Sequence, residues 1–294
     1  MTGLLLTLSA ALGGDIVAPG LCDASAAVVT DGALLVTNDE DAWLYRYSLT
    51  GRPLGRALLG PDDAELDLEG AAAVGDRVWW VGSLGNNKRG EPRPDRSWLI
   101  ATTPDGRELA RYNLRDPLLA SSDAGVPLAA AGLPPKGGGL NVEGLGASAD
   151  GGLWLGLRSP LHASGRALLI PVDVASDAPR IGEAQTVDLG GRGVRSLLWW
   201  PAAEAWLVLA GATDGAADFA LYIWPGAGHP PTPLPANLDG ISPEGMLLLP
   251  SGELLLLSDD GSVDRDGRSC KKRWEDDPMD PAVYFRMRVV PLAP

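Results

Sequence analysis

The sequence predicts an all-β fold, a single β-propeller domain of five blades over residues 1–294. Three observations support this prediction. Short apolar runs alternate with turns that contain most of the 38 Gly and 25 Pro residues, a pattern typical of many strands joined by tight turns. A similar unit recurs along the chain. No segment has the pattern of a long amphipathic helix, and 45% hydrophobic residues are enough for a large core.

The recurring unit starts with a short apolar run that Glu-Gly opens three times. The openings are Leu68-Glu69-Gly70, Val142-Glu143-Gly144 and Pro243-Glu244-Gly245, and two further units have Ser25 and Arg195 at the glutamate position. The five positions are 44, 74, 52 and 49 residues apart, whereas one blade of four strands takes about 40–50 residues. The long interval contains residues 116–140, which are rich in Pro, Gly, Ala and Ser and are interpreted as an inserted loop.

The blades are predicted at residues 23–60, 67–115, 141–189, 193–235 and 241–290. The last of them has no obvious fourth strand. Residues 3–10 are apolar but lack the positive n-region of a secretory signal, and we expect them to supply that strand. Pairing the two ends of the chain would close the ring and remove exposed sheet edges. Six blades remain an alternative if the inserted loop contains strands.

The composition limits which classes of partner the protein can bind. A net charge of -14 argues against nucleic acid, because binding phosphates requires a basic surface. No apolar run approaches the roughly 18–20 residues of a membrane span. Two Cys and two His are too few for the usual zinc sites. We expect a monomer that binds a small molecule. A cytoplasmic location is favoured, with a periplasmic or secreted one as the alternative.

Polar residues are expected to converge at one mouth of the channel. The loops that enter the inner strands and the loops that follow the second strands open on the same face of a propeller. Three carboxylates near one axis repel one another unless a cation, a basic side chain or shifted pKa values compensate. Glu69, Glu143 and Glu244 are therefore predicted to bind a divalent metal, calcium or else magnesium or manganese. No organic cofactor is expected.

Three alternatives to the metal site remain open, and one of them is a ligand site without a metal. Arg158, Arg195 and Lys88 could balance the glutamates in a purely ionic network. The glutamates could also have a structural role, in which they cap backbone N–H groups and join neighbouring blades.

The leading functional hypothesis is a divalent-metal-dependent hydrolase of a small ester, lactone or phosphoester. Glu143 would act as a ligand or general base, and Arg158, Arg195 and Lys88 would stabilise developing negative charge. The alternative is a non-enzymatic binding or scaffold module. A sugar-binding variant of it would need an exposed tryptophan. Ligand contacts are expected where second strands end, from Asn38, Asp39, Ser83, Asn86, Asn87, Arg89, Asp259 and Asp260.

The two cysteines fall in neighbouring blades of a closed ring. Cys22 precedes the first inner strand and Cys270 lies in a long loop of the last blade. A disulfide between them is therefore geometrically feasible, and two free thiols in a cytosolic protein are the open alternative. The pairs Trp79-Trp80 and Trp199-Trp200 place one ring on each face of a sheet, and we expect them in the core.

The motifs in combination resemble a bacterial family known as domain of unknown function 3616. The resemblance rests on Leu68-Glu69-Gly70, on Asn38-Asp39-Glu40 and on residues 79–83, 87–90, 93–94, 141–145 and 155–160. It covers most of the chain and implies a propeller-like fold without an activity.

The Glu-Gly openings also resemble two more distant groups of propellers. In the gluconolactonase type, a glutamate at this position binds a divalent metal, and the phytase-like esterases use calcium. These resemblances imply metal binding by Glu69, Glu143 and Glu244. No residue of this chain matches a catalytic acid or base of either group.

Overall fold

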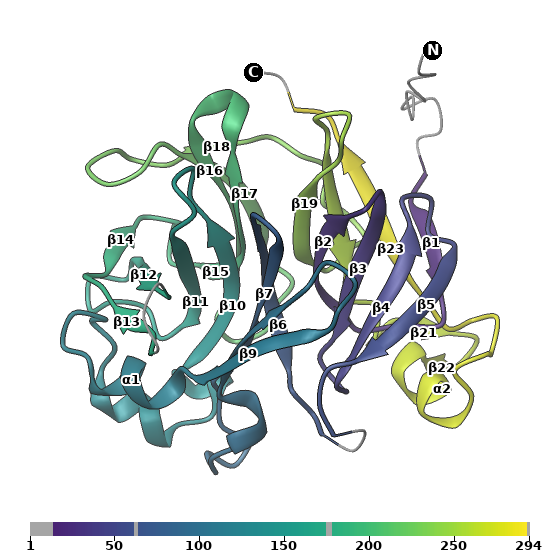
Figure 1. The fold of residues 1–294 in the computed structure, drawn as a ribbon, viewed down its shortest axis with the longest axis horizontal. Coiled ribbons are helices and arrows are strands. Elements are labelled where there is room, and N and C mark those ends of the chain that lie inside the picture. The colour runs from purple at the N-terminus through teal and green to yellow at the C-terminus, as the bar shows by residue number, and fades with distance from the viewer. Residues whose placement is uncertain (1–13, 62–63, 175–177, 293–294) are drawn as a thin grey trace.

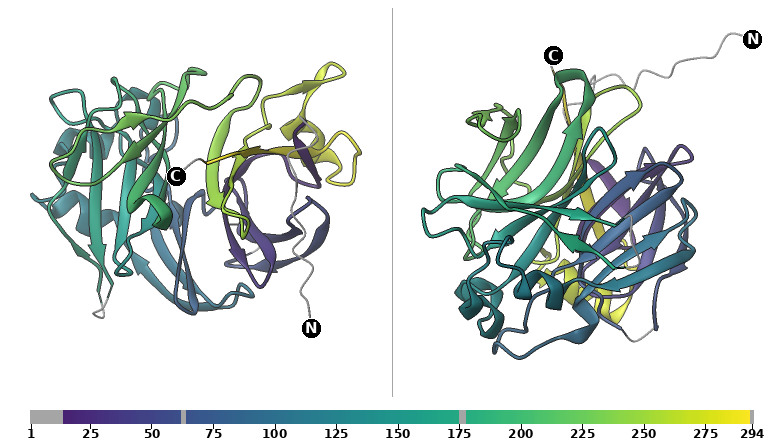
Figure 2. Two further views of the ribbon diagram at one scale, coloured as in Figure 1. Left: turned by 90° about the horizontal axis from the view of Figure 1, so that it is seen from above. Right: turned by 60° about the vertical axis from the view of Figure 1, so that its left-hand side comes forward.

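Five antiparallel sheets stand around a central axis in the computed structural model, which describes residues 14–61, 64–174 and 178–292 (Figures 1 and 2). The innermost strands are β2, β6, β10, β15 and β19. Each of them contacts the next one, and β19 contacts β2. The ring is therefore closed, and the predicted all-β propeller of five blades is confirmed.

The first two blades are regular four-stranded meanders. The first has the order β2-β3-β4-β5 and the second β6-β7-β8-β9. The strands of the first are β2 (Ala24–Thr30), β3 (Ala33–Asn38), β4 (Trp43–Ser48) and β5 (Pro53–Leu58). Those of the second are β6 (Leu68–Val74), β7 (Arg77–Gly82), β8 (Trp98–Thr102) and β9 (Glu108–Asn113), with the 3-10 turn Pro94–Arg96 before β8.

The third and fourth blades follow the same plan with short outer strands. The third contains β10 (Asn141–Ala147), β11 (Leu153–Ser159), β12 (Ala167–Asp173), β13 (Arg180–Ile181) and β14 (Gln185–Val187), and both β13 and β14 pair with β12. The fourth contains β15 (Gly193–Trp200), β16 (Ala205–Gly211), β17 (Phe219–Trp224) and β18 (Thr232–Pro233), with the 3-10 turn Pro201–Ala203 between β15 and β16.

The last blade combines both ends of the described chain in the order β19-β20-β23-β1. Its strands are β19 (Pro243–Leu248), β20 (Leu254–Ser258), β23 (Tyr284–Val290) and β1 (Ile16–Pro19). An N-terminal strand thus closes the ring as predicted, but it is Ile16–Pro19. The predicted segment 3–10 lies outside the described residues.

Two insertions leave the meander pattern. Between β9 and β10 the chain forms α1 (Arg115–Ala120) and the 3-10 helices Leu128–Gly132 and Pro135–Gly137. This described segment contains no strand, which removes the six-bladed alternative. Between β20 and β23 lie the hairpin β21 (Asp264–Arg265) and β22 (Arg268–Ser269) and the helix α2 (Cys270–Asp276).

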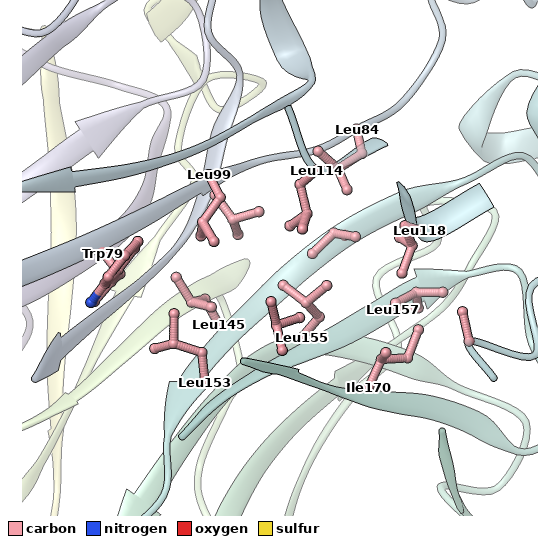
Figure 3. Packing of buried hydrophobic residues seen from close by; sticks show 14 of the residues in the cluster. Trp79, Leu84, Leu99, Leu114, Leu118, Leu145, Leu153, Leu155, Leu157 and Ile170 are labelled. Carbon is pink, nitrogen blue, oxygen red and sulfur yellow. The ribbon is translucent and has the colours of Figure 1, made fainter. Parts of the chain in front are cut away.

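The core is divided among the contacts between neighbouring blades. One buried cluster joins the second and third blades and includes Trp79, Leu99, Leu145 and Leu155 (Figure 3). Four similar clusters join the other pairs of neighbours. Both faces of each sheet are therefore covered, which explains the apolar runs. All ten tryptophans lie in the described part of the chain, and each of them is buried or half-buried.

Candidate functional site at the channel mouth

The same irregularity marks the start of every inner strand. Leu68 pairs with Gly82 and Gly70 with Val81, so Glu69 is an extra residue, a β-bulge. Equivalent register shifts leave Glu143, Arg195 and Glu244 without a partner in the strand pairing of their blades. In the first blade the shift falls at Ser25 and Ala26. Because a bulge re-aims the side chain of the extra residue, these equivalent residues share one backbone geometry at one mouth of the channel.

Two of the three repeated glutamates are bound by arginines. Glu143 is 3% exposed and accepts hydrogen bonds of 2.8 Å from Asn141 Nδ2 and from Arg158 Nη1. Arg195 lies between two blades, with Nη1 2.9 Å from Glu143 Oε2 and Nη2 paired with Glu244. Burial alone would lower the pKa of Arg195, but the two carboxylates outweigh it and raise that pKa. The arginine is therefore charged.

Glu69 differs from its two equivalents. Within the described ranges its carboxylate has no hydrogen bond and no ion pair. Burial raises the pKa of Glu69 well above its usual range, and the negative charges of Glu143, Asp67, Glu244 and Asp39 raise it further. Both effects favour the protonated form of this carboxyl group.

A second ion-pair group lies beside Glu69. Arg96 Nη1 is 3.0 Å from Asp67 Oδ2, and Arg96 also pairs with Glu65. Ser83 donates a hydrogen bond to Asp67. Burial raises the pKa of Asp67 to about 6, although Arg96 and Ser83 both favour its charged form.

Glu69 lines a pocket of about 790 Å³ at this mouth. Five of its lining residues are acidic, namely Asp39, Glu40, Glu65, Asp67 and Glu69 itself. The other residues include Asn141, the two prolines Pro134 and Pro135 and the basic residues Lys88, Arg89, Arg93, Arg96 and Lys136. The opposite mouth is a smaller pocket of about 560 Å³ lined mainly by Ala, Val and Leu. Groups that can perform acid–base chemistry therefore gather at one mouth.

The remaining predicted ligand residues divide into two groups. Asn86 is buried and binds the backbone of the insertion, donating to Ala131 O at 2.9 Å. Asn38 donates to Asp41 Oδ2 at 3.2 Å. Asp260 is fully buried and held by two arginines. Asn87 and Arg89 belong to an exposed turn closed by Glu91. Only Asp39 and Asp259 of this prediction contribute largely desolvated carboxylates without an ion pair, and Asp259 Oδ1 accepts a hydrogen bond of 2.8 Å from Gly261 N.

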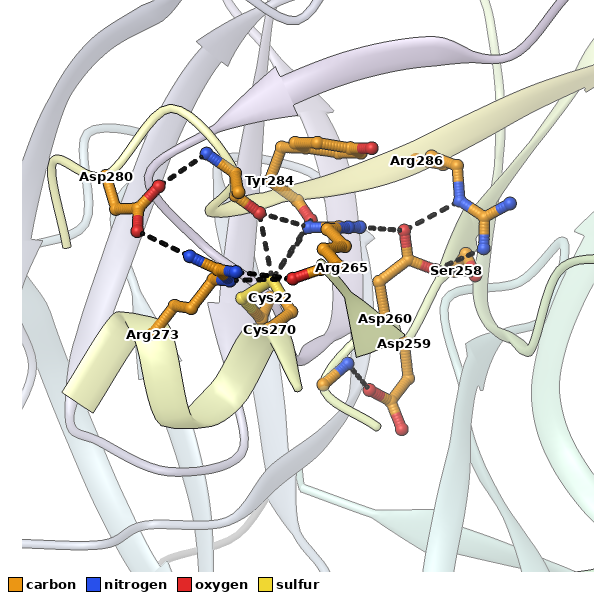
Figure 4. The surroundings of a disulfide bond; sticks show 12 residues. Cys22, Ser258, Asp259, Asp260, Arg265, Cys270, Arg273, Asp280, Tyr284 and Arg286 are labelled. Carbon is orange, nitrogen blue, oxygen red and sulfur yellow. Dashed lines mark hydrogen bonds and ion pairs between the residues drawn. A yellow bond between two sulfur atoms is a disulfide. The ribbon is translucent and has the colours of Figure 1, made fainter. Parts of the chain in front are cut away.

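The structure contains the disulfide Cys22–Cys270, with Cα atoms 5.8 Å apart, rather than two free thiols. It joins the segment before β2 to α2 (Figure 4). Arg265 Nη1 donates to the backbone oxygens of Ala282 and Tyr284, both at 2.7 Å, and Arg265 also pairs with Asp260. The loop between β20 and β23 is thereby fixed against the first blade.

The sequence pattern contained a signal for acidic residues that our predictions missed. Asp23 and Asp67 each stand two places before the bulge residue of their blade, Ser25 and Glu69, and Asn141 holds the same position before Glu143. All three are buried. A search for polar residues at equivalent positions of the repeat, rather than for glutamate alone, would have found them.

Fold and site together define a five-bladed β-propeller protein with acidic and basic residues gathered at one channel mouth. Residues 96–253 match the model of the family described as Protein of unknown function (DUF3616). The chain belongs to this family. No curated protein matches it in sequence, and the described residues include no helix long and apolar enough to cross a membrane.

Solved structures resemble the chain in fold at low identity. Bacteroides ovatus Xyloglucan PUL GH43B is 11% identical with a TM-score of 0.52, and the match covers 83% of this chain and 50% of that protein's chain. Myxococcus xanthus glutaminyl cyclase is 13% identical (TM-score 0.49, 95% and 96% covered). Virginiamycin B lyase from Staphylococcus aureus is 13% identical (TM-score 0.40, 82% and 65% covered). The chain thus spans less than two thirds of the first and the last of these.

Proposed function

We propose that the pocket lined by Glu69 hydrolyses a small ester, lactone or phosphoester, with Glu69 as the group that transfers the proton. The observation that carries this proposal is the isolation of Glu69. It is the one repeated glutamate with no arginine partner, and it lines a pocket large enough for a small molecule. Pockets of roughly 300–1,000 Å³ that hold a few convergent polar groups are typical of small-molecule sites.

The raised pKa of Glu69 suits general acid catalysis. A protonated carboxyl can donate its proton to the leaving oxygen of an ester, and the resulting carboxylate can take a proton from water. The neighbouring carboxylates that raise the pKa of Glu69 include Asp67 and Asp39. Desolvation and like charges are the usual means by which enzymes shift a glutamate pKa toward neutrality.

The basic residues have different roles in this proposal. Arg158 and Arg195 bind Glu143 and Glu244, so they maintain the shape of the site rather than binding the substrate. Lys88 and Lys136 line the same pocket and are exposed. They are placed to attract an anionic group and to stabilise negative charge that develops on an oxygen.

A divalent metal remains part of the proposed chemistry. Of the three predicted ligands, Glu69 alone is not engaged by a basic side chain. When bound near it, a divalent cation would polarise a substrate oxygen and lower the pKa of a bound water. Glu143 and Glu244 would contribute through the electrostatic field at the mouth.

The test is a hydrolysis screen of the purified protein with ester, lactone and phosphoester substrates, with and without calcium, magnesium or manganese. Glu69→Gln should lower kcat at least about 100-fold, the usual contribution of a general acid, while the melting temperature is retained. Glu183→Gln, which changes an exposed glutamate between β13 and β14, should retain full activity. A Glu69→Gln variant as active as the wild type contradicts the role of Glu69. Absence of turnover across the whole panel favours the binding or scaffold module.

We further propose a periplasmic or secreted location, in place of the cytoplasmic one favoured by the sequence. The Cys22–Cys270 disulfide supports this, because such bonds persist mainly in oxidising compartments. Fractionation of producing cells, followed by thiol labelling of the protein from each fraction, tests it. Recovery of the reduced protein from the cytoplasm alone would contradict it.

A further inference from the structure

A separate group of carboxylates lies between the first and last blades, next to the disulfide. Asp23 precedes β2, and Asp39 and Glu40 follow β3. One carboxylate oxygen of each lies within 4.8 Å of the other two. Asp259, which directly follows β20, forms an isolated β-bridge with Asp23. Three segments of the chain thus bring four acidic side chains together.

Two of these carboxylates, one from buried Asp23 and one from half-buried Asp39, have a buried oxygen without a partner. Asp23 is 6% exposed, and in the part of the chain that the structure describes its Oδ2 has no hydrogen bond. The same holds for Asp39 Oδ1. A buried carboxylate oxygen without a partner is costly, so a cation bound to these oxygens would stabilise the group. It contrasts with Glu143, which binds two arginines.

The position of Asp23 is fixed from several sides. Its neighbour Cys22 is bound to Cys270, and Cys22 O accepts a hydrogen bond of 2.9 Å from Asp260 N. Gly261 packs against the Asp23 carboxylate so closely that any side chain there would collide with it. The Asp23 carboxylate is therefore held facing the other two.

Protein cations only partly balance this group. Lys271 pairs with Glu40, and its charge also favours the ionised form of Asp23. Asp23, Asp39 and Asp259 form no ion pair with any residue of the described ranges. Four carboxylates against one ammonium leave a net negative charge.

We propose that Asp23, Asp39 and Glu40 bind a calcium ion. All three ligands are carboxylate oxygens, which hard divalent cations prefer. Calcium–oxygen bonds are about 2.3–2.6 Å long, so oxygens on opposite sides of one ion are about 5 Å apart, in agreement with this cluster. Asp39 and Glu40 also line the large pocket, from which water or a ligand oxygen can complete the coordination.

This site differs from the predicted set of Glu69, Glu143 and Glu244, and of the three ligands only Asp39 was among the residues predicted to bind a ligand. The proposal does not require hydrolase activity, because the ion can bind whether or not the pocket turns over a substrate. Binding would place positive charge at the pocket wall formed by Asp39 and Glu40.

The experiment is calorimetric titration of calcium chloride into protein freed of metal by a chelator. We expect one ion per chain, with a Kd between about 1 μM and 1 mM, the range of protein sites from sensors to extracellular modules. Magnesium should bind at least about tenfold more weakly, because Asp23 and the adjacent pair Asp39 and Glu40 do not impose octahedral geometry. Calcium should also raise the melting temperature.

Matched variants locate the ion. Asp39→Asn and Asp23→Asn should each weaken calcium binding at least tenfold and abolish the rise in melting temperature. Their metal-free forms should melt at or above the wild-type temperature, because each variant removes an unpaired buried charge. Asp95→Asn makes the same change at an exposed position and should bind calcium normally.

Three results would overturn the proposal. They are no saturable binding by the wild type, unchanged binding by both Asp39→Asn and Asp23→Asn, and magnesium binding as tight as calcium binding. None of these results depends on turnover, so failure of the calcium site is distinguishable from failure of the proposed hydrolase.

Discussion

The residues at the equivalent bulge position of the five blades make different interactions. Ser25 Oγ donates to Leu68 O at 2.5 Å and so connects the first blade to the second. Glu143, Arg195 and Glu244 form an ion network across three blades. Glu69 alone is left with a free carboxylate. The bulge places each of these side chains at the channel mouth, and the neighbouring side chains determine which interactions it makes.

The buried acids make a definite prediction for the dependence of stability on pH. Burial raises the pKa of Asp67 to about 6 and that of Glu244 to about 8, and that of Glu69 lies well above its usual range. An acid whose pKa is raised on folding favours the native state at low pH, and this contribution is lost as the pH rises through the folded pKa. In a chelator, the melting temperature should therefore fall between about pH 5 and pH 9.

Thermal denaturation followed by circular dichroism checks this, with Glu69→Gln as the comparison. Each unit of pKa shift corresponds to about 1.4 kcal/mol, so the variant should show a clearly shallower decline. Asp105, Asp150 and Asp280 have lowered pKa values, so their contribution to stability changes only at a more acidic pH than this range. A melting temperature that is constant or rises from pH 5 to pH 9 would contradict the prediction.

Part of the site could be predicted at the residue level. Repetition indicated that Glu69, Glu143 and Glu244 share a location, and the pKa of Glu69 is indeed affected by the other two. Which glutamate pairs with an arginine could not be predicted, because that depends on the distances across the channel. The acidic cluster at Asp23 was missed because its members come from three segments that only the closed ring brings together.

Among the elements, the inner strands depend on the glycines that follow the bulges. The reason is the crowding of the inner strands near the axis. A Cβ on Gly70 would lie 2.7 Å from Leu145 Cβ in the next blade, and one on Gly144 would lie 2.9 Å from Val194 Cγ1. Neither distance is tolerated by real side chains, so glycine lets neighbouring inner strands approach.

Gly70→Ala should therefore destabilise the protein by about 2 kcal/mol, a typical cost of overpacking a core. Urea denaturation measures the change. The control is Gly132→Ala in the insertion, where an added Cβ would meet nothing within 4 Å and the stability should change by less than about 0.5 kcal/mol. Equal stabilities of the two variants would show that the inner strands can separate without cost.

The elements were largely predictable because alternation, turns and repeat length are local signals. Strands such as Leu68–Val74 and Arg77–Gly82 follow directly from their apolar runs. The bulges were not predicted, since an extra residue does not change the apolar pattern on either side. The sequence analysis predicted the closing strand in a segment more apolar than Ile16–Pro19. The strand that closes the ring is determined by its pairing with β23, which the local sequence does not reveal.

In the molecule as a whole, the ring is closed twice, by β1 pairing with β23 and by the disulfide. The cysteines are 248 residues apart. In the chain-entropy description, joining ends so distant stabilises the native state by about 5 kcal/mol at most, with measured values often lower.

Reduction of the disulfide should therefore lower the melting temperature by roughly 10 °C. Calorimetry with and without reductant measures this in the wild type. The double variant Cys22→Ser and Cys270→Ser should melt at the lower temperature and should not respond to reductant. A reduced wild type that melts like the oxidised protein would show that strand pairing alone holds the ring.

The disulfide has one more consequence, for the covalent connectivity of the molecule. Between Cys22 and Cys270 the polypeptide forms a covalent circle, and the exposed turn at Arg89 lies within it. A protease that cuts this turn once would open the circle without releasing a fragment. The nicked protein should therefore migrate as one species of full mass until reductant is added, and then separate into two pieces.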